Sequence, residues 1–427
     1  MLNISKSSVA YLKNSSWMVL ERLLRLLSSL FVGIYLARYL GPTDFGRLNY
    51  TVAFVAVFIP FVELGFSSIL LREFVKNPEH KKHYAGTAFY MSLVSSVLMI
   101  GVINGLNLLV NESQNIRFLI FIYSLALLFK PFQIIDFQFQ SELKSKKSSI
   151  IKSAGLLITS VLKIVFILSK APLVYFIYVY ALDIVLLSLF YVIVHFVTNE
   201  FNFYSYFKKS LCYKMFFSIW PMIISNVAIL LYMRTDQIMI QNMLNEKELG
   251  LYSAATRVYE GIIMITTVLT ISLLPAIMKL KLDHKAKYHK YITLFLSFLF
   301  WSNCALALLI TFFSEGIIGV LFGKEFLDSS FVLVIVSWSL GLTAFGSISS
   351  RYFTVENMEK KLVFRTIVSL SINILLNFIL IPLYGINGSA FATLVSLLVG
   401  NYIIDYFDPE LKTLVKLKNN ALTLKFK

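Results

Sequence analysis

Long runs of apolar residues follow one another along the whole chain, separated by short polar segments. A helix that crosses the hydrocarbon core of a bilayer needs about 20 mostly apolar residues, and these runs reach that length. The pattern therefore predicts twelve membrane-spanning helices. Their expected bounds are 15–39, 48–71, 84–110, 116–137, 149–169, 171–197, 215–243, 248–278, 289–313, 328–350, 362–383 and 387–406.

Two polar turns interrupt this pattern at corresponding places in the two halves of the chain. The first, GPTD at 41–44, holds a proline that cannot continue a helix and a glycine that relaxes the backbone. The second is NEKE at 245–248, and aligning the two turns places Gly46 opposite Gly250. We therefore expect two parallel repeats of six spans each. The predicted organisation is an N-terminal lobe at 1–205 with spans 1–6, a C-terminal lobe at 206–407 with spans 7–12, and a basic cytoplasmic tail at 408–427.

Composition and charge support an all-α integral membrane protein. Only 15% of the residues are charged, 58% are hydrophobic, and the mean hydropathy is +0.75, whereas soluble domains are about 25% charged. The net charge of +16 would indicate nucleic-acid binding in a soluble protein. Here Lys and Arg concentrate in alternate loops and in both terminal segments. Such loops remain on the cytoplasmic side, so both termini are expected in the cytoplasm and no nucleic-acid partner is expected.

Charged residues also occur inside the predicted spans, where each costs at least about 2.5 kcal/mol unless it faces a cavity or a partner. Lys163, Asp136 and Asp405 lie near span ends and are expected to reach the membrane surface. Most of the others gather on spans 1, 2, 7 and 8. The candidate substrate-binding residues are Arg22, Arg25, Arg234 and Arg257, and the candidate coupling or charge-pair residues are Glu21, Glu63, Asp236 and Glu260.

The depths of these residues predict ion pairs across each hairpin. A helix rises about 1.5 Å per residue, so residues at similar distances from a turn lie at similar heights in the membrane. The predicted pairs are Arg22 or Arg25 with Glu63, and Arg234 and Asp236 with Glu260 and Arg257. Glu21 and Arg25 are also expected to pair along one helix, because they are four residues apart.

Two interpretations of these charges remain open. They are either neutral pairs that hold helices together, or they line a water-filled vestibule between the two halves, where the arginines exchange a carboxylate for an anionic substrate. Arginine suits phosphate because its planar guanidinium binds two oxygens at once and stays charged. Glu63 and Asp236 are the candidate coupling residues, since a carboxylate that gains or loses a proton can change partners.

Catalytic and cofactor motifs are missing from the sequence. There is no phosphate-binding loop: LFGKEF at 321–326 lacks the glycine spacing and the hydroxyl residue. The predicted outer loops are too short for a catalytic domain, and Cys212 and Cys304 have no neighbours at metal-ligand spacing. We therefore expect a protein that is not an enzyme, with no catalytic residue, no cofactor and no metal site.

Four stretches together resemble bacterial polysaccharide-export flippases of the O-antigen (Wzx) type. The first is GIYLARYLGPTDFGRLNY at 33–50, preceded by Trp17, Glu21 and Arg25. The others are VELGFSSILLREF at 62–74, RTDQIMIQNMLNEKELGLYSAATRVYE at 234–260 and LLNFILIPLYGINGSAFAT at 375–393. They cover both halves in the order typical of that family. The second turn departs from the first, because Asn245 and Glu246 stand where the first repeat has Gly41 and Pro42.

The resemblance implies a fold of two six-helix lobes, as in the multidrug/oligosaccharidyl-lipid/polysaccharide (MOP) exporter superfamily, which includes the MATE transporters. It implies a flippase in the bacterial inner membrane that moves undecaprenyl-diphosphate-linked oligosaccharide to the outer leaflet by alternating access, coupled to a proton or sodium gradient. Implied partners are a polysaccharide polymerase and a chain-length regulator. The alternative is a cation-coupled drug or metabolite antiporter of the MATE type. Trp17, Tyr232, Tyr252 and Tyr259 are candidates for stacking on sugar faces, although a chain with 15% aromatic residues places aromatics there equally well by chance.

Overall fold

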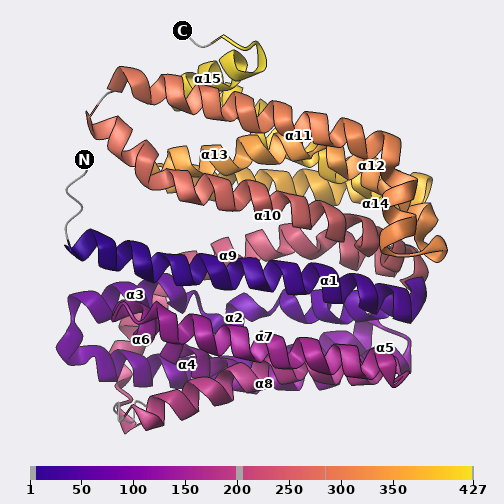
Figure 1. Ribbon diagram of the computed structural model, residues 1–427. Coiled ribbons are helices and arrows are strands. Elements are labelled where there is room, and N and C mark those ends of the chain that lie inside the picture. The colour runs from indigo at the N-terminus through magenta and orange to yellow at the C-terminus, as the bar shows by residue number, and fades with distance from the viewer. Residues whose placement is uncertain (1–5, 199–204, 284, 426–427) are drawn as a thin grey trace. The chain divides into compact units, whose positions relative to one another are not determined.

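The computed structural model describes residues 6–198, 205–283 and 285–425, and these ranges are almost entirely helical, with no strand (Figure 1). The α-helices are α1 (Lys6–Ala56), α2 (Ile59–Glu63), α3 (Phe66–Lys76), α4 (Lys81–Val110), α5 (Gln114–Leu125), α6 (Ile134–Ser141), α7 (Ser145–Leu168), α8 (Leu173–Val197), α9 (Lys209–Met243), α10 (Glu246–Asp283), α11 (Lys285–Leu321), α12 (Ser330–Trp338), α13 (Leu340–Glu356), α14 (Glu359–Asn401) and α15 (Lys412–Leu422). Short 3-10 helices are η1 (Pro78–His80), η2 (Ala126–Gln133), η4 (Lys324–Ser329), η5 (Ile403–Phe407) and η6 (Pro409–Leu411).

Several stretches of the described residues are suited to cross a membrane, and two of them are unusually long. Nine stretches of the described residues are long and apolar enough to cross a membrane, and the bent pair Lys324–Trp338 and Leu340–Glu356 makes a tenth. Two of these stretches, Ser16–Glu63 and Lys360–Phe407, hold 48 residues each. Each contains a glycine with positive φ, Gly41 at 70° and Gly385 at 59°. Each of these two stretches is long enough to form a hairpin of two spans, so the count of twelve spans stays a prediction.

The reversal at Gly385 is evident from the contacts within α14. A Cβ atom added to Gly388 would lie 2.2 Å from the carbonyl oxygen of Leu380. In a straight helix those residues would be separated by about 12 Å along the axis. Asn373 and Thr393 also approach, with Nδ2 and Oγ1 3.5 Å apart. The two halves of α14 therefore lie antiparallel, as expected for spans 11 and 12.

Contacts between residues divide the chain into two compact units. Unit 1 comprises Met1–Leu36 and Thr51–Leu230, and unit 2 comprises Ala37–Tyr50 and Leu231–Lys427. The units differ from the predicted lobes in two places, since unit 2 takes the end of the first span and unit 1 takes the first half of α9. In α9, the buried side chains of Met215, Ile219 and Ile223 belong to the apolar core of unit 1. The lobes, which are defined by span number, stay a prediction.

The two polar turns of the sequence contact each other within unit 2. A Cβ atom at Gly46 would lie 1.8 Å from the carbonyl oxygen of Glu246, and one at Gly250 would lie 1.8 Å from that of Pro42. Each glycine thus allows the backbone of the other turn to approach. Arg47 adds charge to this contact, with Nη1 2.9 Å from Asp44 and Nε 3.9 Å from Glu246. Each turn therefore packs a glycine against a backbone carbonyl of the other turn.

Asp405 lies in a buried ionic cluster rather than at the membrane surface, so the expectation for this residue is wrong. Its carboxylate pairs with Arg365 and with Lys418 of α15, whose Nζ is 2.8 Å from Oδ2. Lys418 is fully buried and also donates to the carbonyl of Asn401 at 2.6 Å. Burial and the Arg365 guanidinium lower the pKa of Lys418 to about 7. The predicted basic tail thus contains a helix, α15, that is anchored by this cluster, while residues 426–427 lie outside the described residues.

Asp136 is likewise buried, and the expectation that it reaches the surface is also wrong. Its Oδ2 atom is 2.6 Å from Nζ of Lys152 and accepts a hydrogen bond from Gln140 at 2.9 Å. Ser148 donates to its other oxygen.

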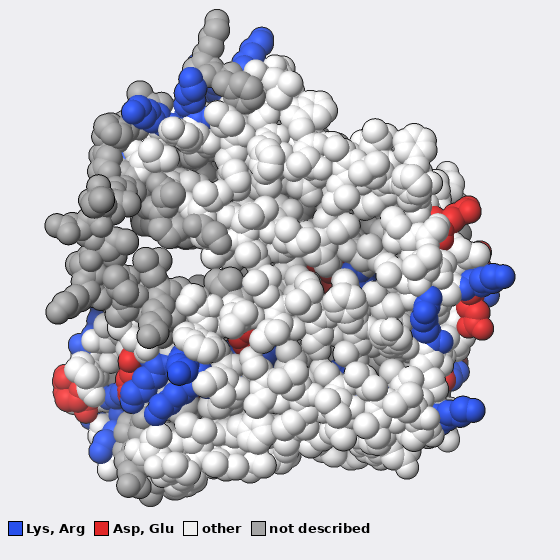
Figure 2. All heavy atoms as spheres, viewed as in Figure 1, with Lys and Arg blue, Asp and Glu red and all other residues white. Residues whose placement is uncertain are grey.

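The pattern of charge on the surface is that of a membrane protein. In each unit, on the face shown in Figure 2, blue and red spheres gather toward the helix ends, and the area between them is almost entirely white.

The turn contact predicts a sharp effect of adding one methyl group. Gly46→Ala and Gly250→Ala should each destabilise the detergent-solubilised protein by about 1–3 kcal/mol, because the carbonyl facing the new Cβ must move. Gly101→Ala is the matched control, since nothing lies within 4 Å of its Cβ position. Thermal unfolding measures the effect. An unfolding temperature of Gly46→Ala that equals that of Gly101→Ala would contradict the contact.

The Asp405 cluster predicts that two substitutions in one site differ strongly. Asp405→Asn leaves two buried cations without a counter-charge and should cost about 3–5 kcal/mol. Lys418→Met keeps the Asp405–Arg365 pair and should cost less than about 1 kcal/mol, because it removes a buried charge together with its desolvation cost. Thermal unfolding of both variants measures this ranking. Equal losses would show that Lys418 is required for stability in its own right.

Candidate functional site

A polar cavity lies inside unit 1 where α1, α7 and α8 meet. Its volume is about 240 Å³. Small and hydroxyl residues keep the helices close here, and Ser28 and Ser160 share a hydrogen bond of 2.6 Å between their Oγ atoms. The lining residues are Arg25, Ser28, Ser29, Val32, Gly33, Leu36, Leu156, Thr159, Ser160, Lys163, Tyr180 and Asp183.

The polar cavity concentrates charge at membrane depth. Two of its lining residues, Arg25 and Lys163, are cations and one, Asp183, is a carboxylate. Lys163 Nζ lies 3.9 Å from the centre of the Tyr180 ring, so this lysine faces the cavity and the expectation that it reaches the surface is wrong. Asp183 accepts a weak hydrogen bond from Thr159 at 3.4 Å. The cavity can therefore accommodate an anionic group near two cations that also have aromatic or carboxylate neighbours.

Glu21 holds Arg25 in place, as their four-residue spacing predicts. Nε of Arg25 donates to Oε1 of Glu21 at 2.9 Å, and Glu21 is buried while Arg25 is partly exposed. The terminal amino groups of Arg25 make no hydrogen bond with a described residue, so they are available to a ligand. Arg22 is exposed and forms no ion pair within the described part of the chain.

The predicted pair between Glu63 and Arg22 or Arg25 is wrong. Glu63 pairs with Lys130, whose Nζ lies 2.8 Å from Oε1. Glu63 is the last residue of α2, and the next two residues, Leu64 and Gly65, both have positive φ, which breaks the helix and redirects its side chains. The distance of Glu63 from the turn along the sequence does not specify which neighbouring helix the carboxylate faces.

Asp236 lies in a buried cage of neutral donors inside unit 2. Its Oδ2 accepts hydrogen bonds from Tyr252 Oη at 2.7 Å and Thr393 Oγ1 at 2.6 Å, and its Oδ1 accepts one from Asn377 Nδ2 at 2.6 Å. Asn377 also donates to Asn373 Oδ1 at 3.1 Å. We call these five residues of α9, α10 and α14 the carboxylate cage. Three direct donors satisfy the carboxylate without any basic residue.

The oxygen atoms of the cage define its chemistry. Besides the carboxylate, the cage offers the hydroxyls of Tyr252 and Thr393 and the amide oxygens of Asn373 and Asn377. Oδ1 of Asn377 is buried and accepts no hydrogen bond within the described residues. One carboxylate with neutral oxygens suits a proton or a monovalent cation, whereas divalent and transition metals favour several charged or imidazole ligands. The described residues contain no group of three or more His, Cys, Asp or Glu side chains that could hold a metal.

The predicted pairs of Arg234 and Asp236 with Glu260 and Arg257 are wrong as well. Arg234 Nη1 donates to Gln237 at 3.2 Å, and the Arg257 guanidinium lies over the Phe45 ring at 5.3 Å. Glu260 is exposed and has no ion-pair partner among the described residues. Arg234 and Asp236 are two residues apart, so a helix directs their side chains about 200° apart, and similar depth does not bring both to one partner.

Most of the carboxylate cage is not evident from the sequence pattern. Tyr252 is a candidate for stacking on sugars by sequence, but its ring is buried and its hydroxyl binds Asp236. Tyr259 is also buried, with its hydroxyl bound to Ser339 and Thr343 at 2.8 and 3.0 Å, so stacking is wrong for it too. Asn373 and Asn377 were identifiable in principle, because two asparagines four residues apart in an apolar span need partners.

Solved structures identify the class of protein. The fold matches the lipid II flippase MurJ in an inward closed conformation with a TM-score of 0.73 and 17% identity, over 97% of this chain and 92% of that one. It also matches an inward-facing multidrug resistance MATE family transporter of the MOP superfamily, with a TM-score of 0.68 and 17% identity, over 92% and 96% of the two chains. The chain is therefore an all-α, multi-pass membrane protein with a MurJ- and MATE-like transporter fold.

The sequence comparison identifies the family. Residues 11–281 match the family described as polysaccharide biosynthesis protein, and the chain belongs to this family. It is 21% identical over 412 residues to the capsular polysaccharide biosynthesis protein CapF of Staphylococcus aureus, covering 92% of this chain and 98% of CapF. It is 35% identical over 91 residues to the probable low-salt glycan biosynthesis flippase Agl15 of Haloferax volcanii, over 21% of this chain and 19% of Agl15. The family resemblance seen in the sequence is thus confirmed.

Proposed function

We propose that this protein is a flippase for an undecaprenyl-diphosphate-linked oligosaccharide, the repeat unit of an O-antigen or similar surface polysaccharide. It moves the lipid from the cytoplasmic to the outer leaflet of the bacterial inner membrane by alternating access. Membership of the polysaccharide biosynthesis family, similarity to Agl15 and the MurJ-like fold support this proposal. A polysaccharide polymerase and a chain-length regulator would act on the product after transfer.

The observation that carries the proposal is the polar cavity with its two cations. Diphosphate and sugar groups cannot enter hydrocarbon without partners, whereas a polyprenyl chain remains in the lipid at no cost. Arg25 presents unbonded guanidinium amino groups at this cavity, and Lys163 adds a second positive charge. A planar guanidinium binds two phosphate oxygens at once, and an ammonium adds a point charge that tolerates movement of the head group. We infer that these two residues hold the diphosphate, with Arg22, Arg234 and Arg257 as further candidate contacts.

We infer that the carboxylate cage couples transfer to an ion gradient. A buried Asp236 with three neutral donors can exchange those hydrogen bonds for a proton or a sodium ion, and its partners lie on α10 and on both arms of the α14 hairpin. Binding of the ion would therefore change contacts among three segments at once, and an ion that prefers one arrangement shifts the population toward it. Glu63 is a weaker candidate, because it is half exposed and already paired with Lys130.

Removal of cavity charge should slow transfer of the lipid. Arg25→Gln and Lys163→Gln should each reduce the initial rate at least about tenfold, equivalent to the loss of one charge-assisted hydrogen bond of about 1.5–3 kcal/mol. The assay reconstitutes the full chain in liposomes with a fluorescent polyprenyl-diphosphate oligosaccharide and measures access of a membrane-impermeant quencher. Lys247→Gln, at the exposed first turn of α10, is the control.

Wild-type rates in both variants would exclude the cavity as the head-group site. Drug transport without lipid transfer would instead support the MATE-type antiporter. Parallel substitutions of Arg22, Arg234 and Arg257 by Gln show whether these arginines contribute to the same step.

Loss of the cage carboxylate should separate transfer from coupling. Asp236→Asn should abolish acceleration by an imposed pH or sodium gradient while slow transfer without a gradient remains. Thr393→Val should raise the sodium concentration needed for half-maximal acceleration if sodium is the ion. If a proton is the ion, a sodium gradient should accelerate neither the wild-type protein nor this variant. Thr366→Val, on the same helix with its hydroxyl bonded to Leu362, is the control. An unaltered response of Asp236→Asn to both gradients would refute coupling at the cage.

A further inference from the structure

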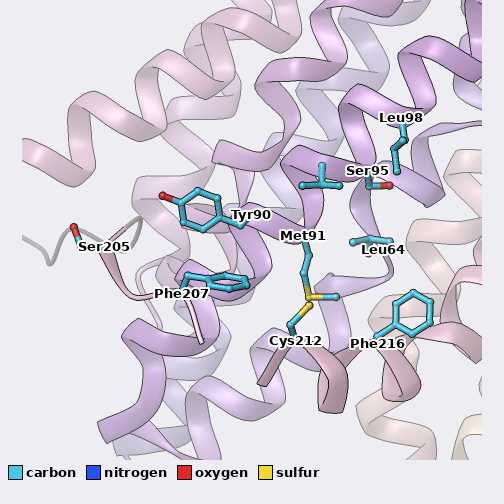
Figure 3. Close-up of a pocket in the computed structure, with 10 residues that line it drawn as sticks. Leu64, Tyr90, Met91, Ser95, Leu98, Ser205, Phe207, Cys212 and Phe216 are labelled. Atoms are coloured by element: carbon cyan, nitrogen blue, oxygen red, sulfur yellow. The ribbon is translucent and has the colours of Figure 1, made fainter. Parts of the chain in front are cut away.

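A second, larger cavity in unit 1 has a different character from the polar cavity. It is an open groove of about 700 Å³ along α4 and the start of α9 (Figure 3). We call it the apolar groove; its lining residues are Leu64, Tyr90, Met91, Val94, Ser95, Leu98, Ser205, Phe207, Cys212 and Phe216. It shares no lining residue with the polar cavity. Whatever occupies it therefore binds apart from Arg25 and Lys163.

The wall of the groove is made of flexible and aromatic apolar side chains. In Figure 3 the sulfur atoms of Met91 and Cys212 face each other at its centre, with Leu64 and Phe216 to one side. The rings of Tyr90 and Phe207 pack edge to face, with centroids 5.7 Å apart, on the other side. Both α4 and α9 belong to stretches that are long and apolar enough to span a membrane. A groove on such helices is exposed to lipid chains, and its chemistry suits hydrocarbon.

One end of the groove is basic. The segment that carries Phe207 continues into Lys208 and Lys209, which are both exposed. It is fixed against α4, because the backbone N–H of Lys208 donates to Thr87 Oγ1 at 3.2 Å. Lys82 of α4 lies over the ring of Tyr206, with Nζ 5.6 Å from its centre. Three lysines thus gather where the groove meets the end of the helices.

The two sequence segments that form the groove carry no acidic residue of their own. There is no Asp or Glu between residues 80 and 111, or between residues 201 and 235. Other titratable groups near this end include His83, whose ring packs on Tyr206 at 5.4 Å, the exposed Lys214 and the exposed Glu79. The neighbouring Glu142 is already paired with Lys81. An apolar groove that opens at a cationic rim is complementary to a molecule with a hydrocarbon chain and an anionic head.

We propose that the apolar groove binds an anionic phospholipid of the surrounding membrane, with one acyl chain along α4 and its head group at Lys82, Lys208 and Lys209. The lysines favour a membrane phospholipid over the transported lipid. Separate ammonium groups act as point charges for a single phosphate, whereas a diphosphate is better bound by guanidinium groups, and no arginine lies between residues 80 and 111 or between residues 201 and 233. Each lysine near a membrane surface adds about a fivefold preference for an anionic lipid.

The native thiol of Cys212 reports occupancy of the groove directly. In Cys304→Ser protein, Cys212 is the one remaining cysteine of the chain. Its rate of reaction with a maleimide is measured in detergent after addition of phosphatidylglycerol or of phosphatidylcholine with the same acyl chains. Phosphatidylglycerol should slow the reaction at least about fivefold more than phosphatidylcholine, because the bound chain covers the sulfur.

Two variants and one control test the two halves of the site. Lys82→Gln with Lys208→Gln and Lys209→Gln should remove the difference between the two lipids while weak protection by both remains. Leu98→Trp fills the groove away from Cys212 and should restore a fast reaction in the presence of either lipid. The reciprocal protein, Cys212→Ser with Cys304 as its one thiol, should react at the same rate in both lipids, because Cys304 belongs to unit 2.

Equal protection of Cys212 by the two phospholipids would overturn the proposal, as would equal protection of Cys304 by phosphatidylglycerol. Stronger protection by a polyprenyl phosphate than by phosphatidylglycerol at the same mole fraction would assign the groove to the transported lipid instead, and would also overturn it. None of these outcomes depends on whether the protein is a flippase. A result that refutes phospholipid binding in the apolar groove would therefore leave the proposed function untouched.

Discussion

The free-energy cost of an unpartnered charge in hydrocarbon governs the arrangement of polar side chains in this protein. Asp136, Asp236 and Asp405 are all nearly or fully buried, and each is satisfied in a different way. Asp136 has one lysine and hydroxyl and amide donors, Asp405 has two cations, and Asp236 has neutral donors alone. Because an ion in low dielectric must be paired, hydrogen-bonded or neutralised, these sets determine which helices have to lie together.

The difference between these sets separates structural from functional roles. A carboxylate held by two fixed cations, such as Asp405, is stabilised as an anion and resists change. Asp236 has no fixed counter-charge, so it gains from a cation or a proton that arrives from outside. The polar cavity has the opposite character. The two terminal amino groups of Arg25 make no hydrogen bond with a described residue, and an anion that enters the cavity can accept hydrogen bonds from them. The proposed transporter would thus keep one site for an anion and one for a cation, in different compact units.

Close backbone contact, with the Arg47–Glu246 ion pair beside it, joins the two similar turns. The helix ends at Gly41, and residues 37–50 then pack with unit 2, where Gly46 and Gly250 allow reciprocal approach of the two turns. Phe45 follows the same path and packs edge to face on Phe326, at 6.2 Å between ring centroids. The glycines match in the aligned repeats because both sides of one contact need the same absence of a side chain.

The sequence by itself determined that this is an all-α membrane protein, the approximate position of its spans, the turn at Gly41 and the Glu21–Arg25 pair. These follow from hydropathy over about 20 residues, from turn chemistry or from contacts within one helix, which are local properties. The family followed from the resemblance of four sequence stretches. Only the tertiary structure decided the partners of Glu63, Asp236 and Asp405, the cage formed with Asn377 and Thr393, and the docking of α15 through Lys418. The position of a residue along its helix follows from its distance in sequence from the helix end. The direction of a side chain around the helix axis, and the neighbour that meets it, depend on kinks such as Leu64–Gly65 and on the packing of segments more than a hundred residues apart.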